Sequence, residues 1–459
     1  MIFDCLKKIV TGAAVSMLTT LVVADEKPNI VLIMADDLGY ECITANGGES
    51  YQTPVLDNLA KQGMRFEHCY SQPICTPSRV KLMTGMYNVR NYAVFGLLEK
   101  TQRTFAHQLR EGGYKTGIVG KWQLGKDTSL PEHFGFDEYC LWHMLRSKSR
   151  YASPGLEING VKKDFPGKYG PDVCADYACD FIERHKDGPF LLYYPMILTH
   201  CPFEPTPDSE DWDPTSKGSK TYKGDAKYFG DMVNYMDKIV GRILDQLEAS
   251  EVRENTIVLF TGDNGTDKPV VSMMNGRKVV GAKGTTSDAG CRVPFIAHWP
   301  GQTPAGRVSR DLVDFSDFMP TLCEAAGVPL PSDRPIDGRS FLPQLRGEKG
   351  NPRDWIYIWY ARNGGPTGKE FTRNQRYKLY GSGEFYDIQN DVLEKNPLSL
   401  ARLTTEQAGV RGKLLAALNQ YDDARPPRFA NWAAEAKKAK QKAQAEMKAK
   451  QQKNKPKSS

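Results

Sequence analysis

Polar side chains follow two apolar segments of the chain that have the composition of buried strands. They are Asp36 and Asp37 after residues 29–35 (NIVLIMA), and Asp263 and Asn264 after residues 255–261 (NTIVLFT) and a glycine. Ligands of an open parallel sheet collect beyond the carboxyl ends of its strands, so we expect these side chains to converge there. Three carboxylates and an amide would need a cation between them, and an all-oxygen set suits Ca²⁺ or Mg²⁺ rather than zinc. Turn chemistry and helix capping are the alternative for either pair alone.

A cysteine stands where a helix is predicted to begin. Residues 75–79 (CTPSR) open a segment with helical character, which places Cys75 near the helix N-terminus. Backbone N–H groups without helical partners and the helix dipole favour an anion at that place. Arg79, about one turn later, would hold that anion or residue 75. A structural cysteine at an ordinary helix start is the alternative.

The first 24 residues have the pattern of a signal peptide. Lys7 and Lys8 precede an apolar run over residues 9–24 that is short for a bilayer span. We expect cleavage, export to the periplasm or the medium, and no transmembrane span in the mature chain, with a membrane-anchoring helix as the alternative. Loss of Cys5 leaves nine of the ten cysteines. Because thiols outside the cytosol tend to pair, the odd number indicates one cysteine that is free or chemically altered. The pairing of the other eight stays open, and buried, reduced thiols are an equal alternative for several of them.

Composition and charge exclude several classes of protein. The chain is 40% hydrophobic and 25% charged, which excludes disordered, collagen-like and multispan membrane proteins. Its net charge of +6 comes from residues 433–459, which carry nine Lys against two Glu, so the rest is near neutral. This Lys-rich tail has no apolar face and no interleaved aromatic residues. It is therefore predicted to be a frayed helix or disordered, and no nucleic-acid partner is expected.

The order of the predicted elements indicates an α/β fold. From residue 28, short apolar segments alternate with helical patterns, which is typical of βαβ units and a large, mostly parallel sheet. Further strands are expected at residues 115–120, 189–195 and 293–298. A helix is expected over residues 225–248, where apolar residues recur at helical spacing. The expected parts are a signal peptide (1–24), a large domain (25–345), a small C-terminal α+β subdomain (346–432) and the tail (433–459).

The CTPSR string, with Leu-Met-Thr-Gly at residues 82–85, resembles the signature of the type I, formylglycine-dependent, arylsulfatase-like sulfatases of the alkaline phosphatase-like superfamily. Other segments resemble further motifs of this family in the same order along the chain: residues 28–40, 120–125, 200–202, 261–265, 281–301 and 337–340. They extend over roughly residues 28–345, most of the mature chain. The resemblance implies an alkaline phosphatase-like α/β/α sandwich with a smaller C-terminal subdomain.

The resemblance also implies a role for each matching residue. A dedicated maturation enzyme would convert Cys75 to formylglycine, whose hydrate would attack the ester sulfur. Arg79 would hold the modified residue. The sulfate oxygens would be bound by Lys121 and Lys283, and His200 would lie beside the leaving oxygen as general acid. The implied ligands of the cation, which is Ca²⁺ in preference to Mg²⁺, are Asp36, Asp37, Cys75 after modification, Asp263 and Asn264.

One catalytic position departs from the family pattern. The second signature usually reads Gly-Lys-Trp-His-Leu-Gly, whereas this chain has Gln123 in place of the histidine. Glutamine can form hydrogen bonds, but it cannot take up a proton near neutral pH. The late segment reads Asp288-Ala289-Gly290 where the family usually has an acidic residue and two glycines, which is a mild change. Gln123 is therefore the departure that bears on mechanism.

The predicted function is that of an exported, Ca²⁺-dependent sulfatase. A sulfated carbohydrate is the expected substrate, because an anionic polymer suits an exported enzyme better than a small aryl ester. Residues 142–151 mix aromatic and cationic types and would suit a groove for a sulfated sugar, with a solvated loop as the alternative. A phosphonate or phosphate ester hydrolase of the same superfamily can share the cysteine signature. A non-catalytic binder of sulfated glycans would explain Gln123, but the other site residues argue against it.

Overall fold

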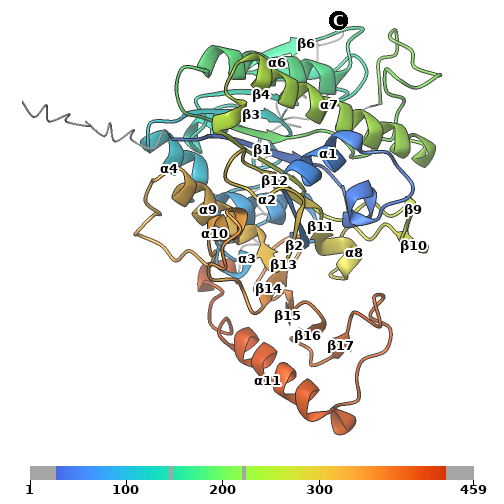
Figure 1. Ribbon diagram of the computed structural model, residues 1–459, viewed down its shortest axis with the longest axis vertical. Coiled ribbons are helices and arrows are strands. Elements are labelled where there is room, and N and C mark those ends of the chain that lie inside the picture. The colour runs from blue at the N-terminus through green and yellow to red at the C-terminus, as the bar shows by residue number, and fades with distance from the viewer. Residues whose placement is uncertain (1–26, 143, 145–147, 220–223, 431–459) are drawn as a thin grey trace, which may run out of the picture.

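The computed structural model describes residues 27–142, 144, 148–219 and 224–430. A sheet of eleven strands crosses the molecule, with helices on both faces (Figure 1). The strands are β1 (Asn29–Ala35), β2 (Met64–Tyr70), β3 (Lys115–Gly120), β4 (Glu138–Trp142), β5 (Gly155–Ile158), β6 (Val161–Asp164), β7 (Phe190–Pro195), β8 (Thr256–Gly262), β11 (Arg292–Val293), β12 (Phe295–His298) and β13 (Arg307–Asp314). Their order is β11-β2-β12-β8-β1-β7-β3-β4-β5-β6, and β13 pairs with β2. The run from β8 to β4 is parallel, so the predicted α/β/α fold with a mostly parallel sheet is confirmed.

Alternate side chains of the central strand β1 pack into two separate cores, one on each face of the sheet. The helices are α1 (Pro54–Gln62), α6 (Gly170–His185) and α7 (Phe229–Ala249) on one face, and α2 (Cys75–Thr84), α4 (Phe105–Glu111) and α9 (Phe318–Ala325) on the other. In β1, Val31 and Ile33 pack with the first set. Ile30, Leu32 and Met34 pack with the second. Because both faces of β1 are buried, its sequence is apolar throughout and shows no alternation.

The predicted elements are found with small shifts at their ends. The strand predicted at residues 293–298 is divided into β11 and β12, which run antiparallel to β2. The predicted long helix begins at Phe229, after a 3-10 turn at Ala226–Tyr228. The sequence did not predict β2, because the half-buried Arg65, Glu67 and His68 interrupt its apolar pattern. Short helices complete the large domain: α3 (Asn88–Asn91), α5 (Leu130–His133), α8 (Asp288–Cys291) and α10 (Leu342–Leu345).

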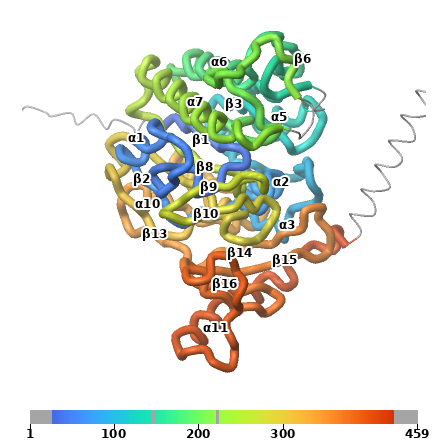
Figure 2. Tube along the Cα trace, turned by 90° about the vertical axis from the view of Figure 1, so that its right-hand side faces the viewer, coloured from blue at the N-terminus to red at the C-terminus, as the bar shows by residue number. Residues whose placement is uncertain are grey.

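The C-terminal part forms a separate small sheet below the large one (Figure 2). Its antiparallel strands are β14 (Ile356–Tyr360), β15 (Lys369–Arg373), β16 (Tyr377–Tyr380) and β17 (Phe385–Asp387), and α11 (Thr405–Asn419) packs on β15 and β16. This agrees with the predicted α+β subdomain. Ile356 and Phe371 pack with Tyr70 and Cys291 of the large domain, so the two parts share a core. The remaining hairpin, β9 (Val271–Met274) with β10 (Arg277–Val280), lies on the large domain.

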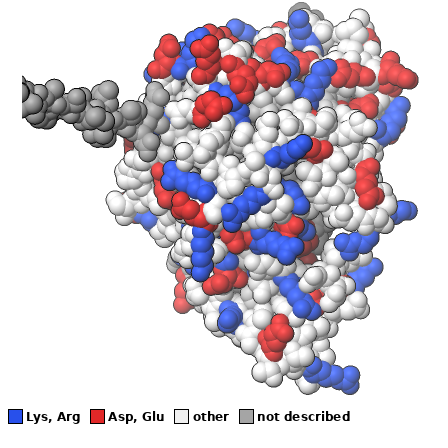
Figure 3. Space-filling view, in the orientation of Figure 1, with Lys and Arg blue, Asp and Glu red and all other residues white. Residues whose placement is uncertain are grey.

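The nine cysteines within the described ranges form no disulfide bond, and eight of them are buried. No described helix combines the length and the apolar character that crossing a bilayer requires. Basic and acidic side chains are interspersed over the face shown in Figure 3, as expected for a folded part that is near neutral. The predicted signal peptide, the Lys-rich tail, and residues 143 and 145–147 of the predicted sugar-binding segment lie outside the described residues.

Candidate active site

The parallel pairing of β1 with β8 brings the two polar pairs together. The register aligns Ala35 with Gly262, so the residues that follow both strands leave the sheet at the same edge. The Asp37 N–H donates to Asp263 Oδ1 at 3.0 Å, and the Asn264 amide donates to Asp37 Oδ1 at 2.8 Å. Asp36, Asp37, Asp263 and Asn264 are all fully buried. The structure therefore gathers the four side chains that the sequence placed beyond the strand ends.

Backbone geometry makes this gathering possible. Asp37 has a φ of 59°, in the left-handed region that Asp tolerates better than most residues. Gly262 lies against the backbone of the first loop, where a Cβ atom would come within 2.1 Å of the Leu38 carbonyl oxygen. A side chain at position 262 would therefore push the two loops apart.

Two lysines face the carboxylates of the first loop: Lys121 is buried and Lys283 is partly buried. Lys121 Nζ donates to both carboxylate oxygens of Asp36, at 2.5 and 2.7 Å. Lys283 Nζ forms an ion pair with Asp37 and lies 3.1 Å from His200 Nε2. Burial opposes ionisation of Asp36, but the surrounding positive groups, Lys121 first among them with Arg79 and Lys283, together hold the pKa of Asp36 well below its usual range. Both lysines therefore lie at the strand edge where the resemblance places the sulfate.

The helix α2 presents Cys75 and Arg79 to this edge. Cys75 is its first residue, and its side chain is 2% exposed. Arg79 donates to Asp263 Oδ2 at 2.9 Å and to the Lys121 carbonyl at 3.0 Å. Burial lowers the pKa of Arg79, but the neighbouring acidic groups, Asp263 first and Asp36 with it, together raise the pKa above its usual value, so the guanidinium stays charged. Among the described residues, the buried Arg79 Nε has no hydrogen-bond partner, which leaves one donor for another ligand.

The thiol of Cys75 is not prepared for nucleophilic attack. Burial raises its pKa above the ordinary value of a cysteine, and the nearby Lys121 only partly offsets that effect. A thiolate is the reactive form of cysteine, so the unmodified residue would be a weak nucleophile at neutral pH.

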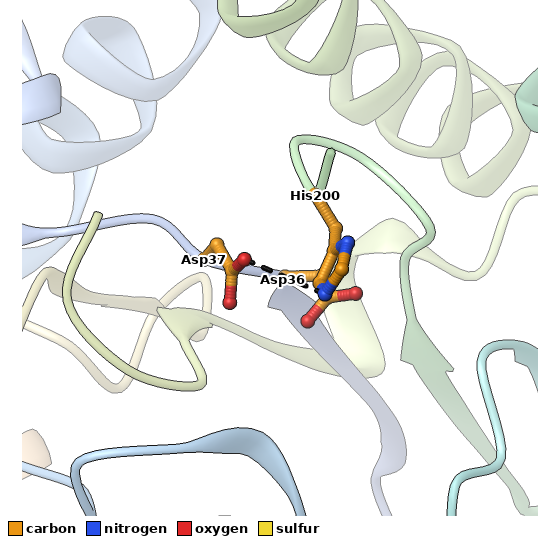
Figure 4. A group of neighbouring side chains, drawn as sticks. All are labelled: Asp36, Asp37 and His200. Carbon is orange, nitrogen blue, oxygen red and sulfur yellow. Dashed lines mark ion pairs between the residues drawn. The ribbon is translucent and has the colours of Figure 1, made fainter. Parts of the chain in front are cut away.

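The residues at the strand edge fit a hard cation. Asn264 Oδ1 is buried and accepts no hydrogen bond from the described residues, which leaves a carbonyl oxygen available for a metal. Burial and the charge of Asp36 raise the pKa of Asp263 to about 7, a cost that a divalent cation would remove. Ligand atoms of Asp36, Asp37 and His200 lie within 4.8 Å of one another (Figure 4). The sequence did not predict that His200, 3.6 Å from Asp37 Oδ2, would join this group.

His200 lies between the lysine and an arginine that the sequence did not single out. Arg150 Nη1 lies 3.0 Å from His200 Nδ1. The Arg150 guanidinium stacks over the Trp142 ring at 3.9 Å, so two residues of the predicted sugar-binding segment lie beside the site. Burial and the charge of Lys283 lower the pKa of His200 well below its usual value, which makes the imidazole neutral.

A cavity of about 750 Å³ opens onto this group. It is lined by Cys75, Gln123, His200 and Lys283, which the sequence predicted to be catalytic. Gln123 is half-buried and has a φ of 59°. The lining also contains residues that no sequence motif signalled: Phe95, Phe203, Asp267, Lys268, Tyr360 and Arg362. The volume falls in the range of small-molecule sites.

Two family models match the sequence. The model named Sulfatase matches residues 28–328, and the model named N-sulphoglucosamine sulphohydrolase, C-terminal, matches residues 283–422. The chain belongs to the sulfatase family. It is 34% identical over 373 residues to N-acetylgalactosamine-6-sulfatase of Canis lupus familiaris, which is 73% of this chain and 69% of that protein.

Solved structures agree with this membership. The sulfatase matches the crystal structure of Ps i-CgsB in complex with k-i-k-neocarrahexaose with a TM-score of 0.73 and 26% identity, over 87% of this chain and 94% of the other. A phosphonate monoester hydrolase of Agrobacterium radiobacter has the same fold, with a TM-score of 0.64 and 20% identity, over 86% of this chain and 96% of the other. Family membership makes the protein a hydrolase of sulfuric esters.

Proposed function

We propose that this sulfatase removes sulfate from a sulfated carbohydrate, and that residue 75 is the nucleophile after conversion of Cys75 to formylglycine. The observation that carries the proposal is the position of Cys75 at the start of α2, in a cavity that it shares with His200 and Lys283. The raised pKa of the thiol supports modification, because the unmodified residue would react slowly. The names of the matched relative and of the Ps i-CgsB complex support a sugar substrate.

Each residue around Cys75 would have its own role in sulfate transfer. Hydrated formylglycine supplies one hydroxyl group for attack on sulfur and a second whose deprotonation allows sulfate to leave. Lys121 and Lys283 would bind the sulfate oxygens and stabilise their charge. His200 is neutral beside Lys283 in this structure, but the negative charge of a bound sulfate group would raise its pKa, so that the protonated imidazole would give a proton to the leaving oxygen of the sugar. Arg79, through its remaining donor, would hold residue 75 in place.

A cation would free these lysines for the substrate. We propose that Ca²⁺, in preference to Mg²⁺, is bound by oxygen atoms from the strand edge and residue 75: Asp36, Asp37, Asp263, Asn264 and modified Cys75. The cation supplies positive charge that polarises the sulfate ester. With these carboxylates neutralised, the ammonium groups of Lys121 and Lys283 can turn from Asp36 and Asp37 to sulfate oxygens.

The chain's processing is part of the same proposal. We propose that residues 1–24 direct export to the periplasm or the medium and are removed, and that a formylglycine-generating enzyme modifies Cys75. A catalytic domain would end near residue 345, and the small subdomain would follow to residue 432. No nucleic-acid partner is proposed.

Hydrolysis of matched esters by one preparation tests the proposed reaction. The comparison is 4-nitrophenyl sulfate with 4-nitrophenyl phenylphosphonate, followed by N-acetylgalactosamine 6-sulfate, with Cys75→Ala as the inactive control. We expect a higher kcat/KM for the sulfate ester than for the phosphonate, and release of sulfate from the sugar. The reverse preference would favour the phosphonate hydrolase, which the shared fold allows. Binding of sulfated sugar without release of sulfate would favour a non-catalytic binder.

A further inference from the structure

A second cavity lies beside the one that contains Cys75. It has a volume of about 450 Å³ and lies between the C-terminal sheet and the segment that follows Lys283. Gly284 and Tyr360 line both cavities, so the two share a wall. The second cavity is therefore adjacent to the first, on the side of Gly284 and Tyr360.

Buried contacts hold the floor of the second cavity in place. Lys378 is fully buried, and its Nζ donates to the Thr286 carbonyl and, at 2.7 Å, to Glu394 Oε1. The Tyr380 hydroxyl donates to Glu394 and lies 3.2 Å from Thr286 Oγ1. These contacts join the C-terminal sheet to the segment that carries Lys283. A site on such a floor is preorganised, which lowers the entropic cost of binding.

The lining of the second cavity combines aromatic faces with a few polar groups. Tyr360 and Tyr386, which are partly exposed, supply the aromatic surface, whereas Tyr380 is buried. Lys369 Nζ lies 4.5 Å from the centre of the Tyr380 ring, and Glu384 also lines the cavity. Aromatic faces pack well against the C–H faces of a pyranose ring, while the ammonium and carboxylate groups suit its hydroxyls.

The second cavity has no excess of positive charge. Its charged lining residues are Lys369, Glu384 and Glu394, and the buried Lys378, which is not part of the lining, pairs with Glu394. The first cavity differs, because its basic lining residues exceed its acidic one: Lys268, Lys283 and Arg362 against Asp267. The first cavity therefore selects an anion, whereas the second does not.

We propose that the second cavity binds an uncharged sugar unit next to the sulfated unit, so that the substrate is an oligosaccharide or polysaccharide rather than a free monosaccharide. The subsite rests on the proposed function of the first cavity, because only a sulfated sugar held there places its neighbour at Tyr360 and Gly284. It assigns to the C-terminal subdomain a direct part in substrate binding.

Calorimetric binding to the full-length Cys75→Ala protein tests the subsite without turnover. The probes are N-acetylglucosamine 6-sulfate and the disaccharide galactosyl-β1,4-N-acetylglucosamine 6-sulfate, whose added unit is uncharged. We expect the disaccharide to bind about 10-fold more tightly, and Lys369→Met and Tyr386→Ala each to remove most of that gain. Lys413→Met is the matched control, because Lys413 is exposed on α11 and does not line the cavity. It should keep the gain.

A charged neighbour provides a second comparison. Extending N-acetylgalactosamine 6-sulfate with glucuronate, as in a chondroitin 6-sulfate disaccharide, should give a smaller gain, because the cavity has no excess positive charge. Equal affinity for the monosaccharide and the galactosyl disaccharide would overturn the subsite. A loss of the affinity gain in Lys413→Met as large as that in Lys369→Met would overturn it as well. Sulfate release by the unmutated protein is measured in parallel. A gain that depends on Lys369 without any sulfate release would refute the proposed function and leave the subsite standing.

Discussion

Replacing Arg79 with methionine is predicted to lower the stability of the metal-free protein strongly. Arg79 is 1% exposed and pairs with Asp263 at 2.9 Å, with Asp36 at 3.7 Å. Methionine keeps much of the apolar stem but leaves Asp263 buried without its partner. Removing one partner of a buried pair costs about 3–5 kcal/mol. With an unfolding entropy of about 2.1 cal/mol/K per residue and roughly 400 folded residues, the melting temperature should fall by about 4–6 °C.

Thermal unfolding of purified variants in the presence of a chelator measures this effect. The matched control is Arg184→Met, because Arg184 pairs with Glu138 and Asp180 at the surface, where a pair is worth about 0–1 kcal/mol. The double variant Arg79→Met/Asp263→Asn removes both charges and should recover part of the loss, which makes the coupling measurable. A loss in Arg79→Met no larger than that in Arg184→Met would refute the reasoning.

Three further predictions concern the cation, the catalytic glutamine and a buried acid. Ca²⁺ should raise the melting temperature of the chelated protein, and Asn264→Ala should reduce that shift because it removes the free Oδ1 ligand; equal shifts would contradict the site. Release of the desulfated product should show a burst followed by slow turnover, and Gln123→His should raise the steady-state rate by a factor of about 10²–10⁴. Absence of a burst would contradict that prediction. Burial raises the pKa of Asp237 to about 6, so its protonation stabilises the fold at low pH and this contribution is lost as the pH rises through 6. As the pH rises from 4 to 7, the melting temperature of Asp237→Asn should therefore rise relative to that of the unmutated protein. A difference in melting temperature that does not depend on pH would contradict this prediction.

The sequence predicted the parts of the site that depend on local pattern. Asp36 and Asp263 each follow an apolar strand directly, so their meeting required only that β1 and β8 be parallel neighbours, as the register shows. The contact between Arg150 and His200 could not be predicted, because it depends on how a segment beyond β4 folds back over the sheet. The same holds for Tyr360 and its neighbours, which reach the cavity only through packing of the C-terminal sheet.

Local pattern also explains which elements of the fold were predicted. β1 is apolar throughout because both of its faces are buried, so it was recognised with its observed bounds. β2 is an inner strand of the large sheet, but polar and charged residues at its half-buried positions interrupt the apolar pattern by which a strand is recognised. Its place depends on pairing with β11, β12 and β13, which follow it by more than 200 residues. Contacts over such separations leave no short-range pattern in the sequence.

Mass spectrometry of the peptide that contains residue 75, taken from catalytically active protein, tests the central claim most directly. The account predicts an aldehyde, or its hydrate, in place of the Cys75 thiol, in a fraction that rises in proportion to the rate of sulfate release across preparations. Active protein that carries only the unmodified thiol at position 75 would contradict the account.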